Sequence, residues 1–365
     1  MKRILYIGSF EMPDLNAAAQ RVLSISKALR DRNYDVSFYG ITYHDDQGGM
    51  VDGFNYDTYQ YPKGSLAWLK YALGSGIIDY IKKKKPDFVI LYNYPAIAQE
   101  RIIAFCRKNG IKTVGDITEW YEPSFLPKRL DTNYRMIVSN KHLDGIIVIS
   151  RYLADYYKNN NLIQLPPMVD KKEKKWDLKG LERKDNLIRL VYIGTGSKKD
   201  RLDKIINSIR SIDSRLFHLD VIGIDEKQYE DIYHKKLDLT SMDVVFHGRL
   251  PHQQALVYLI SADFQIFFRD FIRKNNAGFP TKFAESMSAG IPVITNKISN
   301  IDDYVINGVN SFMIDNLNDD EIREVLKRVS MLNRTEIDGI KNKCLKEEFD
   351  YRRYSQSIDA FMKSL

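Results

Sequence analysis

Short apolar runs alternate with amphipathic stretches along the first half of the chain. Residues 3–8 form an apolar run that ends at Gly8, and the stretch 17–33 places Val22 and Ile25 on one helical face. The alternation continues through apolar runs at residues 36–40, 87–93, 112–117, 144–150 and 161–170. Because these runs are short and apolar throughout, they predict parallel strands with helices on both faces of the sheet.

The pattern breaks over residues 171–187, which are highly charged and have almost no apolar periodicity. Apolar runs then resume at residues 188–194, 217–224, 244–248, 263–268 and 291–295. The sequence thus predicts an α/β protein with two Rossmann-like, doubly wound parallel-sheet domains. We expect a first domain over residues 1–170, a linker over residues 171–187, a second domain over residues 188–345 and a terminal helix over residues 346–365. Because ligands of such sheets bind at the carboxyl ends of the strands, we expect the domains to face a central cleft.

Composition narrows the classes of protein to which this chain can belong. Its 365 residues include two cysteines, Cys106 and Cys344, which form neither a disulfide framework nor a metal motif. The six histidines show no metal-ligand spacing. No apolar run of about 18 residues is present, and the first residues do not resemble a signal peptide. We therefore expect a cytoplasmic protein.

The formal net charge of +7 is compatible with nucleic acid, an anionic membrane surface or phosphate-bearing ligands. No zinc finger, RNP-like aromatic motif or recognition helix is found in the sequence. Nucleic acid is therefore not expected as a partner, and phosphate groups and anionic lipid are the remaining candidates.

A glycine-rich loop over residues 194–200, with the sequence GTGSKKD, follows a predicted strand and precedes a predicted helix. Glycine lets the backbone approach a ligand closely, and a helix N-terminus with adjacent lysines favours a diphosphate. The loop is neither a complete dinucleotide fingerprint nor a Walker A motif. A glycine-rich turn with solvated lysines is an equal alternative.

The second candidate for ligand binding is the stretch 278–294, in which Pro280 and Thr281 begin a predicted helix. Lys282 and Glu285 lie three residues apart on the first turns of this helix. From spacing alone a surface ion pair is the favoured interpretation, because such pairs are common on helices. A carboxylate near a helix N-terminus is also favourable in itself.

Residues 280–295, PTKFAESMSAGIPVIT, strongly resemble the signature helix of glycosyltransferase family 4, the glycosyl transferases group 1 domain of the GT-B fold. Other stretches agree with this family in order and spacing, namely residues 144–157, 165–170, 188–206 and 244–268. The resemblance covers essentially the whole second half of the chain and, more loosely, the first half. It implies a GT-B fold and transfer of a sugar from a nucleotide-sugar donor.

The resemblance implies roles for several residues. Glu285 takes the position of the family carboxylate that binds the ribose hydroxyls, and charged hydrogen bonds of this kind contribute about 1.5–3 kcal/mol each. Lys199 takes the position of the lysine that neutralises the diphosphate. Arg249 and Leu250 would contact the base, largely through their backbone. Two residues at the helix start would lie near the distal phosphate, namely Thr281 and Lys282.

The sequence also departs from the family pattern. The arginine that usually follows the strand glycine, here Gly194, is replaced by Thr195, and Arg201 or Arg269 would have to supply that charge. A second glutamate is often present eight residues before the first, and Ala277 stands there in this chain. These departures leave a non-catalytic nucleotide-sugar-binding partner subunit as an alternative. A UDP-sugar 2-epimerase with the GT-B fold is another.

The first domain is expected to contribute to the same site. The loop after Gly8 would close over the sugar and diphosphate, and it enters a helix near Asn16. The stretch 115–120 follows a predicted strand, and its acids Asp116 and Glu119 are the candidate catalytic residues. The alternatives, a helix cap for Asp116 and solvent exposure for Glu119, carry nearly the same weight.

The family resemblance further implies transfer with retention of configuration at the anomeric carbon. No metal ion and no other cofactor are expected, because basic side chains and helix dipoles stabilise the departing diphosphate. The expected partners are a nucleotide-sugar donor and a glycan or polyprenyl-linked acceptor, in the synthesis of a bacterial surface polysaccharide. In this family the tail after about residue 345 crosses back to the N-terminal domain.

The stretch 63–85 combines Trp68, Tyr71 and Tyr80 with a basic end. A helix of this composition can rest on an anionic membrane and present a lipid-linked acceptor. Apolar residues surround much of the predicted helix, so a partly buried core helix is an equal alternative. Peripheral contact with the inner face of the cell membrane is therefore one of two expectations for this segment.

Overall fold

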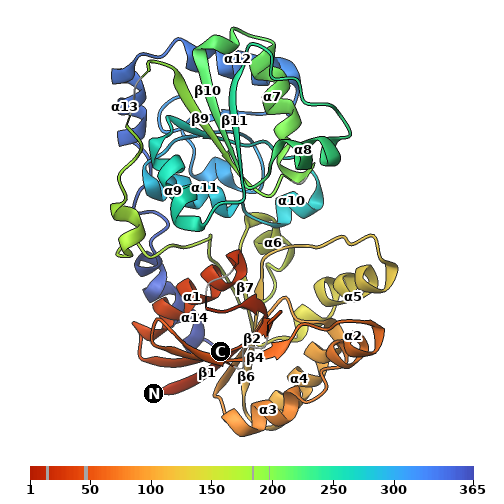
Figure 1. Cartoon of the computed structure of the whole chain (residues 1–365). Helices are drawn as coiled ribbons and strands as arrows, with labels where there is room; N and C mark the ends of the chain where they lie inside the picture. Colours follow the sequence, from red (N-terminus) through yellow and green to blue (C-terminus); the bar gives the residue numbers. More distant parts are fainter. Residues whose placement is uncertain (14–15, 45–47, 183–184, 197) are drawn as a thin grey trace. The chain divides into compact units, whose positions relative to one another are not determined.

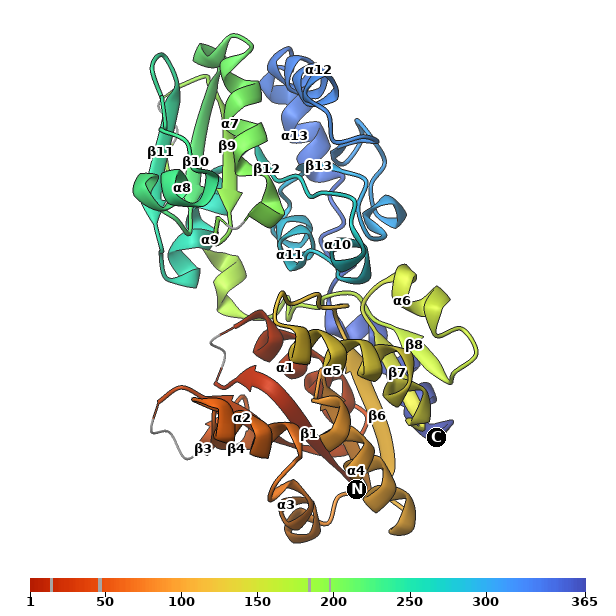
Figure 2. The same cartoon turned by 90° about the vertical axis from the view of Figure 1, so that its right-hand side faces the viewer.

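The computed structural model describes residues 1–13, 16–44, 48–182, 185–196 and 198–365. These residues form two compact units, each with its own sheet (Figure 1 and Figure 2). The first unit comprises Met1–Val169, Ala277–Phe279 and Asp350–Leu365, and the second comprises Asp170–Asn276 and Pro280–Phe349. They are called the first and the second domain below.

An eight-stranded sheet forms the centre of the first domain, in the order β3-β4-β2-β1-β5-β6-β7-β8. Neighbouring strands are parallel, except that β3 is antiparallel to β4. The strands are β1 (Lys2–Glu11), β2 (Tyr34–Thr42), β3 (Gly48–Val51), β4 (Phe54–Gln60), β5 (Phe88–Tyr92), β6 (Lys112–Ile117), β7 (Gly145–Val148) and β8 (Leu162–Gln164). The strand order reverses at β1, and the carboxyl ends of strands at such a switch point are the usual place for a ligand.

Helices cover both faces of this sheet. They are α1 (Ala17–Arg30), α2 (Ser65–Ala72), α3 (Ile77–Lys84), α4 (Ala96–Lys108), α5 (Leu126–Ile137), η1 (Ser139–His142), α6 (Arg151–Tyr156), η6 (Tyr351–Tyr354) and α14 (Ser355–Lys363). Successive residues of β1 point to opposite faces. Ile4 and Tyr6 pack in one buried cluster with residues of α1 and α14, and Leu5 and Ile7 pack in another with residues of α3 and α4.

The stretch 63–85, interpreted from the sequence as one helix, is two helices, α2 and α3. Gly74 and Gly76 lie between them with φ angles of 68° and 79°, a left-handed conformation that interrupts an α-helix. Ile77 and Ile81 of α3 are buried, whereas α2 has no fully buried residue. Full burial in this stretch is thus confined to α3.

The second domain contains six parallel strands in the order β11-β10-β9-β12-β13-β14. They are β9 (Ile188–Ile193), β10 (Phe217–Ile222), β11 (Asp243–Gly248), β12 (Phe264–Ile266), β13 (Val293–Asn296) and β14 (Phe312–Ile314). The order reverses at β9, as it does at β1 in the first domain. The prediction of two doubly wound parallel sheets is confirmed.

Helices also cover both faces of the second sheet. They are η2 (Lys174–Asp177), η3 (Lys198–Asp200), α7 (Leu202–Arg210), η4 (Ser214–Leu216), α8 (Glu226–Tyr233), α9 (His252–Ser261), α10 (Arg273–Ala277), α11 (Thr281–Ala289), η5 (Ile301–Asp303), α12 (Asp319–Ser330) and α13 (Arg334–Asn342). Ile205 of α7 and Leu326 of α12 pack in one buried cluster, and Leu256 and Leu259 of α9 pack in another. In the described part of the chain, no helix combines the length and the apolar character needed to cross a bilayer.

The charged stretch 171–187, expected as a linker, lies in the second domain. Trp176 and Leu178 pack against the apolar cluster that contains α9. The indole nitrogen of Trp176 also donates a hydrogen bond to the carbonyl oxygen of Asp170, 2.8 Å away. Two apolar side chains thus attach this segment to the domain that follows it, although residues 183 and 184 lie outside the described part.

The segment Asp350–Leu365 belongs to the first domain, although it follows the second domain in sequence. Ile358 and Phe361 of α14 share a buried cluster with Val22 and Ile25 of α1, and these helices lie side by side in Figure 1. Burial of four such side chains is a large favourable term, at about 1.5–3 kcal/mol each. The core of the first domain is therefore built from both ends of the chain.

Candidate functional site

A buried carboxylate holds two cations at the carboxyl end of the second sheet. Oδ2 of Asp200 lies 2.6 Å from Nζ of Lys282, and its Oδ1 lies 2.7 Å from Nε of Arg269. Asp200 is only 6% exposed. Although burial alone would raise it, the two neighbouring cations hold the pKa of Asp200 well below its usual range. One carboxylate and two cations leave an excess positive charge, which a phosphate group can neutralise.

Separate elements bring this cluster together. Gly194 follows β9, Arg269 follows β12, and Lys282 lies in the first turn of α11. A Cβ atom at Gly194 would lie 2.9 Å from Nζ of Lys282 and 3.1 Å from Oδ2 of Asp200, so a side chain there would displace the ion pair. Asn296 at the end of β13 accepts a hydrogen bond from the Arg269 amide and donates one to the Arg269 carbonyl, at 2.8 and 2.9 Å.

The N-terminus of α11 adds to the positive potential of this cluster. Pro280, which precedes the helix, makes no side-chain hydrogen bond to its first turn, and Thr281 is exposed there. The backbone N–H groups of a first helical turn have no intrahelical partner and attract anions. Burial, and more weakly the charges of Arg269 and Lys199, lower the pKa of Lys282, although Asp200 opposes them. Lys199 is therefore close enough to Lys282 for their charges to interact.

Glu285 is paired with a histidine that the sequence analysis did not connect with it. Nε2 of His252 lies 2.6 Å from Oε1 of Glu285, and the Glu285 side chain is 22% exposed. His252 is the first residue of α9, and Glu285 lies one turn into α11. Because the two residues are 33 positions apart, no local spacing could have indicated the pair.

The segment between β11 and α9 contains Arg249 and Leu250. Gly248 turns the chain there with a φ of 64°, which favours glycine. Arg249 is exposed, and Leu250 is partly buried against the cluster that contains α9. The Arg249 side chain is thus accessible, whereas Leu250 mainly anchors the segment.

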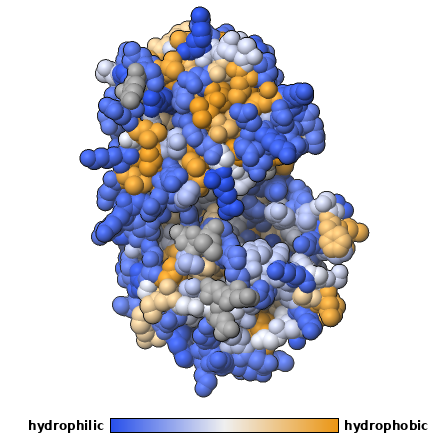
Figure 3. Space-filling model, viewed as in Figure 1, coloured by the Kyte–Doolittle hydropathy of each residue, from blue (hydrophilic) through white to orange (hydrophobic). Residues whose placement is uncertain are grey.

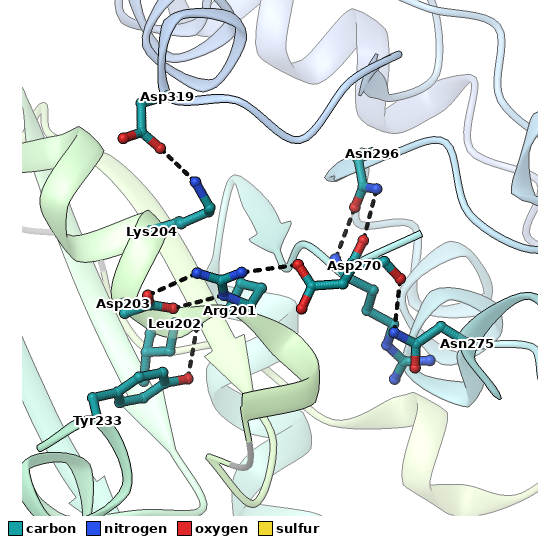
Figure 4. Close-up of polar contacts among 10 residues, drawn as sticks. Arg201, Leu202, Asp203, Lys204, Tyr233, Asp270, Asn275, Asn296 and Asp319 are labelled. Atoms are coloured by element: carbon teal, nitrogen blue, oxygen red, sulfur yellow. Dashed lines mark hydrogen bonds and ion pairs between the residues drawn. The ribbon is translucent and has the colours of Figure 1, made fainter. Parts of the chain in front are cut away.

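Arg201 is engaged by carboxylates of its own domain (Figure 4). Its Nη1 lies 2.8 Å from Oδ1 of Asp270 and its Nη2 lies 3.1 Å from Oδ2 of Asp203. The hydrogen bond to Asp203, more than the pair with Asp270, raises the pKa of the Arg201 guanidinium above its already high usual value. The backbone of Arg201 is left-handed, with a φ of 43°. Arg201 and Arg269 were the two candidates to replace the arginine that the phosphate loop lacks. Arg269 lies in the cationic cluster around Asp200, whereas Arg201 pairs with other carboxylates.

Two further positions of the family pattern can be placed. Thr195 is exposed after Gly194, and Ser197 of the same loop lies outside the described residues. Ala277 has no exposed surface. A glutamate at that position would have to be buried, which is unfavourable without a partner, so the alanine fits its surroundings.

Asp116 is buried in the first domain. Its Oδ1 lies 2.8 Å from Nη2 of Arg21, and its Oδ2 accepts a hydrogen bond from the Tyr6 hydroxyl at 2.6 Å. Arg21 also donates to the carbonyl oxygen of Leu165 at 3.1 Å. Asp116 has no exposed surface, so its carboxylate connects β6, β1 and α1 and is not accessible to a ligand in this structure.

Gly8 and Asn16 have identifiable local roles. A Cβ atom at Gly8 would lie 2.6 Å from the carbonyl oxygen of Tyr92 on the neighbouring strand β5, so the close approach of β1 and β5 requires glycine. Oδ1 of Asn16 accepts a hydrogen bond from the Ala19 amide at 2.9 Å and caps α1. The loop between them includes residues 14 and 15, which lie outside the described part.

Glu119 lies on the wall of a cavity in the first domain, three residues after buried Asp116. The cavity has a volume of about 350 Å³. Its wall consists of Ser9, Tyr61, Trp68, Tyr71, Asn93, Pro95, Glu119, Tyr121, Pro123, Lys128, Asp131, Thr132 and Arg135. Sequence reasoning had selected Glu119 as a catalytic candidate and Trp68 and Tyr71 for a membrane contact, but it did not bring them together, because they come from separate segments between β1 and α5. Of the two candidate catalytic acids, Glu119 is the one beside an open space.

Comparison with known families supports this description of the fold. Residues 173–342 match the family described as glycosyl transferases group 1. A search among curated proteins found no match.

Several solved structures resemble the whole chain. A sucrose-phosphate synthase from Thermosynechococcus elongatus is 12% identical with a TM-score of 0.76, and the match covers 100% of this chain and 98% of the other. HepE from Anabaena, in complex with UDP and glucose, is 14% identical with a TM-score of 0.72 and full coverage of both chains, 100% and 100%. The lipopolysaccharide outer core galactosyltransferase WaaB is 17% identical with a TM-score of 0.68, covering 99% of each chain.

These matches define the class of the protein. Two Rossmann-like domains with this topology form the GT-B fold, which the solved structures share over their whole length. The match to glycosyl transferases group 1 over residues 173–342 indicates that the protein is a glycosyltransferase. The family resemblance seen in the sequence is thus confirmed.

Proposed function

We propose that the protein transfers a sugar from a nucleotide-sugar donor to a glycan or lipid-linked acceptor, with retention of configuration at the anomeric carbon. The observation that carries this proposal is the cationic cluster of Lys282 and Arg269 around Asp200, next to Glu285 on α11. A nucleoside diphosphate needs cations for its phosphates and an acceptor for its ribose hydroxyls. The second domain offers both within one helical turn.

In the proposed donor complex the diphosphate lies at the N-terminus of α11. Lys282, Arg269 and Lys199 would neutralise it, assisted by the amides of the first turn. Positions three apart on a helix are about 5–6 Å apart at Cβ, which matches the separation of adjacent phosphate and ribose groups. Glu285 would then accept hydrogen bonds from the ribose hydroxyls, and the segment of Arg249 and Leu250 would contact the base.

His252 supports the role of Glu285 in this proposal. The pair holds Oε1 of Glu285 toward α9 and leaves the other carboxylate oxygen for a ligand. Two structural neighbours are described with a uridine diphosphate sugar, one with UDP-glucose and the other with UDP-2-fluoro glucose. Uridine nucleotides are therefore the first ligands to try.

We propose that the reaction requires no metal ion or other cofactor. The leaving group of the transfer is a nucleoside diphosphate, and its developing negative charge is stabilised by fixed cations and helix amides. Lys282 and Arg269 are held in place by Asp200 and Asn296, so little reorganisation is needed when this charge appears. Glu119, on the wall of the first-domain cavity, is the proposed catalytic carboxylate.

We propose a cytoplasmic setting and a role in bacterial surface polysaccharide synthesis, with peripheral contact to an anionic membrane. Apolar side chains gather at the right-hand edge of Figure 3, where Figure 1 places α5 and α2. The exposed apolar residues of this face are Leu66, Leu69, Phe125, Leu126, Leu130, Tyr134 and Ile137. Lys70 and Arg129 are exposed on the same two helices, and such a combination of apolar and cationic side chains favours an anionic bilayer.

Vesicle sedimentation tests the membrane contact. The protein should sediment with phosphatidylcholine vesicles that contain phosphatidylglycerol and should stay in solution with phosphatidylcholine alone. A double variant, Leu130→Ser with Arg129→Ser, should lose this binding, whereas Met331→Ser, at an exposed apolar residue of the second domain, should keep it. Equal binding of the double variant and the wild type would refute the role of this face.

Thermal unfolding with nucleotide ligands tests the donor site. A ligand at about 100 times its Kd should raise the free energy of unfolding by roughly 2.7 kcal/mol. We expect one nucleotide series to stabilise the wild type and Glu285→Ala to lose that stabilisation. Glu324→Ala, which removes an exposed carboxylate on α12, should retain it. If no nucleoside diphosphate or nucleotide sugar stabilises the folded wild type, the proposed donor site is wrong.

A further inference from the structure

The strand β11 lies at an edge of the second sheet. Among the described strands it pairs with β10 alone, and Figure 2 shows it at the outer side of the second domain. An edge strand has backbone N–H and C=O groups that point away from the sheet and can pair with another strand. Over Asp243–Gly248, β11 therefore offers a row of such groups.

This edge is less protected than the other edges of the two sheets. In the described part of the chain, the edge strands β14 and β8 have three residues each and β3 has four, whereas β11 has six. Proteins commonly protect an exposed edge with a short strand, a proline or a lysine side chain. β11 contains neither proline nor lysine, and Val245 near its middle is 40% exposed.

Helices pack on both faces of β11 and hold it in place. On one face, the ring of Phe246 lies edge to face with that of Tyr229 in α8, with centroids 6.0 Å apart. On the other face, the His247 ring lies 4.3 Å from that of Tyr258 in α9, and its Nε2 lies 2.6 Å from Oδ1 of Asp220. The strand is therefore fixed in an extended conformation, and its edge is the part that can pair.

The sequence of β11 is complementary to itself in the antiparallel direction. In a pair of two copies centred on Val245, Asp243 of one copy lies opposite His247 of the other. Val244 of one copy likewise lies opposite Phe246 of the other. Side chains directly opposite each other have Cβ atoms about 4.5–5.5 Å apart and interact, and opposite charges there are favourable. The Asp243 side chain is 49% exposed, so a second copy can reach it.

The charges beside Asp243 limit repulsion between two such edges. The hydrogen bond to Asp220, together with Asp243, raises the pKa of His218 to about 9, so His218 is protonated at neutral pH. Its Nδ1 lies 2.9 Å from Oδ2 of Asp243 and partly neutralises that carboxylate. The carboxylates of two copies can therefore lie at one junction.

We propose that β11 pairs with β11 of a second copy of this chain, antiparallel and centred on Val245, and so joins two second-domain sheets into one. This inference goes beyond the proposed function and does not depend on the donor site. A two-fold axis at Val245 brings identical strands together in the antiparallel direction, so the assembly closes at two copies. A strand from another protein would not require the self-complementary order of Asp243 and His247. Because one strand edge is a small interface, the dimer should dissociate on dilution.

Sedimentation velocity over a range of protein concentrations tests the dimer. The weight-average mass of the wild type should approach twice that of one chain as the concentration rises. Val245→Lys places two like charges opposite each other at the axis and should keep the mass of one chain. Val245→Thr, which retains a β-branched residue, should behave as the wild type does. Ile306→Lys, at a residue of the same domain that is 62% exposed outside β11, should also dimerise.

Cysteine variants test the register of the pair. The native cysteines are buried and should not react. Val245→Cys should form a disulfide between two copies on mild oxidation, because its Cβ atoms face each other across the axis. Asp243→Cys should not link to itself, since four residues of strand separate the two copies of this position by about 13 Å. A mixture of Asp243→Cys and His247→Cys should form the mixed disulfide, and Ile306→Cys serves as the control for random collisions.

Three results would overturn the proposal. A wild type with the mass of one chain at every concentration would leave this edge to a strand of another protein. A dimer that Val245→Lys does not disrupt would use another face of the molecule. The same conclusion would follow if Val245→Cys formed no more disulfide than Ile306→Cys. Circular dichroism establishes that each variant is folded, and none of these measurements depends on nucleotide binding, so a failure of the donor site is recognised separately.

Discussion

The carboxylate of Asp200 and the ammonium of Lys282 lie 2.6 Å apart, and both side chains are almost entirely buried. The Asp200 carboxylate lies between Lys282 and Arg269, and its negative charge allows these two cations to lie close together without a ligand. In the proposed function the diphosphate joins this cluster as a second anion. The affinity for the donor should therefore depend on the ion pairs that Asp200 makes with Lys282 and Arg269.

Lys282→Met should weaken the binding of nucleoside diphosphate strongly. The loss of one charged hydrogen bond of about 1.5–3 kcal/mol corresponds to roughly ten- to 150-fold in Kd. Isothermal titration with UDP and other nucleoside diphosphates provides the measurement. Lys327→Met, at an exposed ion pair on α12, removes the same charge and should leave the Kd unchanged. A wild-type Kd in Lys282→Met would exclude the phosphate role of this lysine.

Asp200→Asn should destabilise the second domain and strengthen its response to an anion. Removing the carboxylate of a buried ion pair typically costs about 3–5 kcal/mol, because the partner charges remain buried. A bound diphosphate would restore the missing negative charge, so the rise in Tm on adding nucleotide should exceed that of the wild type. Asp319→Asn, which breaks the exposed pair with Lys204, should change stability by about 1 kcal/mol or less. An unchanged nucleotide response in a destabilised Asp200→Asn protein would contradict this account.

The two acids of the first domain should respond differently to amidation. Asp116→Asn breaks the buried pair with Arg21 and should lower the free energy of unfolding by about 3–5 kcal/mol. Glu119→Gln changes a group beside an open cavity, so stability should change little while kcat falls. Chemical denaturation and turnover of the two variants provide the comparison. A stable Glu119→Gln protein with wild-type turnover would remove Glu119 from the catalytic candidates.

Stability should fall on the alkaline side because of His218. The hydrogen bond to Asp220, together with Asp243 at 2.9 Å, raises the pKa of His218 to about 9. The unfolded value is about 6.5, so the stabilisation is complete below about pH 6.5 and is lost as the pH rises through about 9. We expect a loss of about 1–2 kcal/mol, because solvent screens this half-buried group. His218→Gln should show a flatter stability profile between pH 6.5 and 9.5 in urea denaturation, and an unchanged slope would contradict the assignment.

Much of the fold could be predicted because its signals are local. The apolar runs within β1 and β9 are each followed by a glycine, Gly8 or Gly194, and this pattern alone indicates buried parallel strands. The division of the stretch 63–85 was also present in the sequence, since Gly74 and Gly76 are poor helix residues. Apolar periodicity concealed it, because α2 and α3 each continue the same pattern.

The sequence predicted individual residues of the candidate site but not the contacts between them. Lys282 and Glu285 lie on one helix, but their partners Asp200 and His252 come from loops and elements far away in sequence. Asp200 follows two lysines in the glycine-rich loop, and the sequence analysis assigned no role to it. No spacing rule reports that a loop carboxylate is buried between two cations, because that depends on how β9, β12 and α11 meet. The first-domain cavity escaped prediction for the same reason.

The contribution of α14 to the first domain has a consequence for the synthesis of the protein. The ribosome completes residues 1–169 early, but Ile358 and Phe361 emerge only after the whole second domain. Until then the apolar side of α1 that holds Val22 and Ile25 lacks its cover, and a nascent chain in this state is prone to association. The second domain, whose segments all precede Asp350, can finish folding first. The first domain is thus translated first, but its core can be completed only after the second domain has been synthesised.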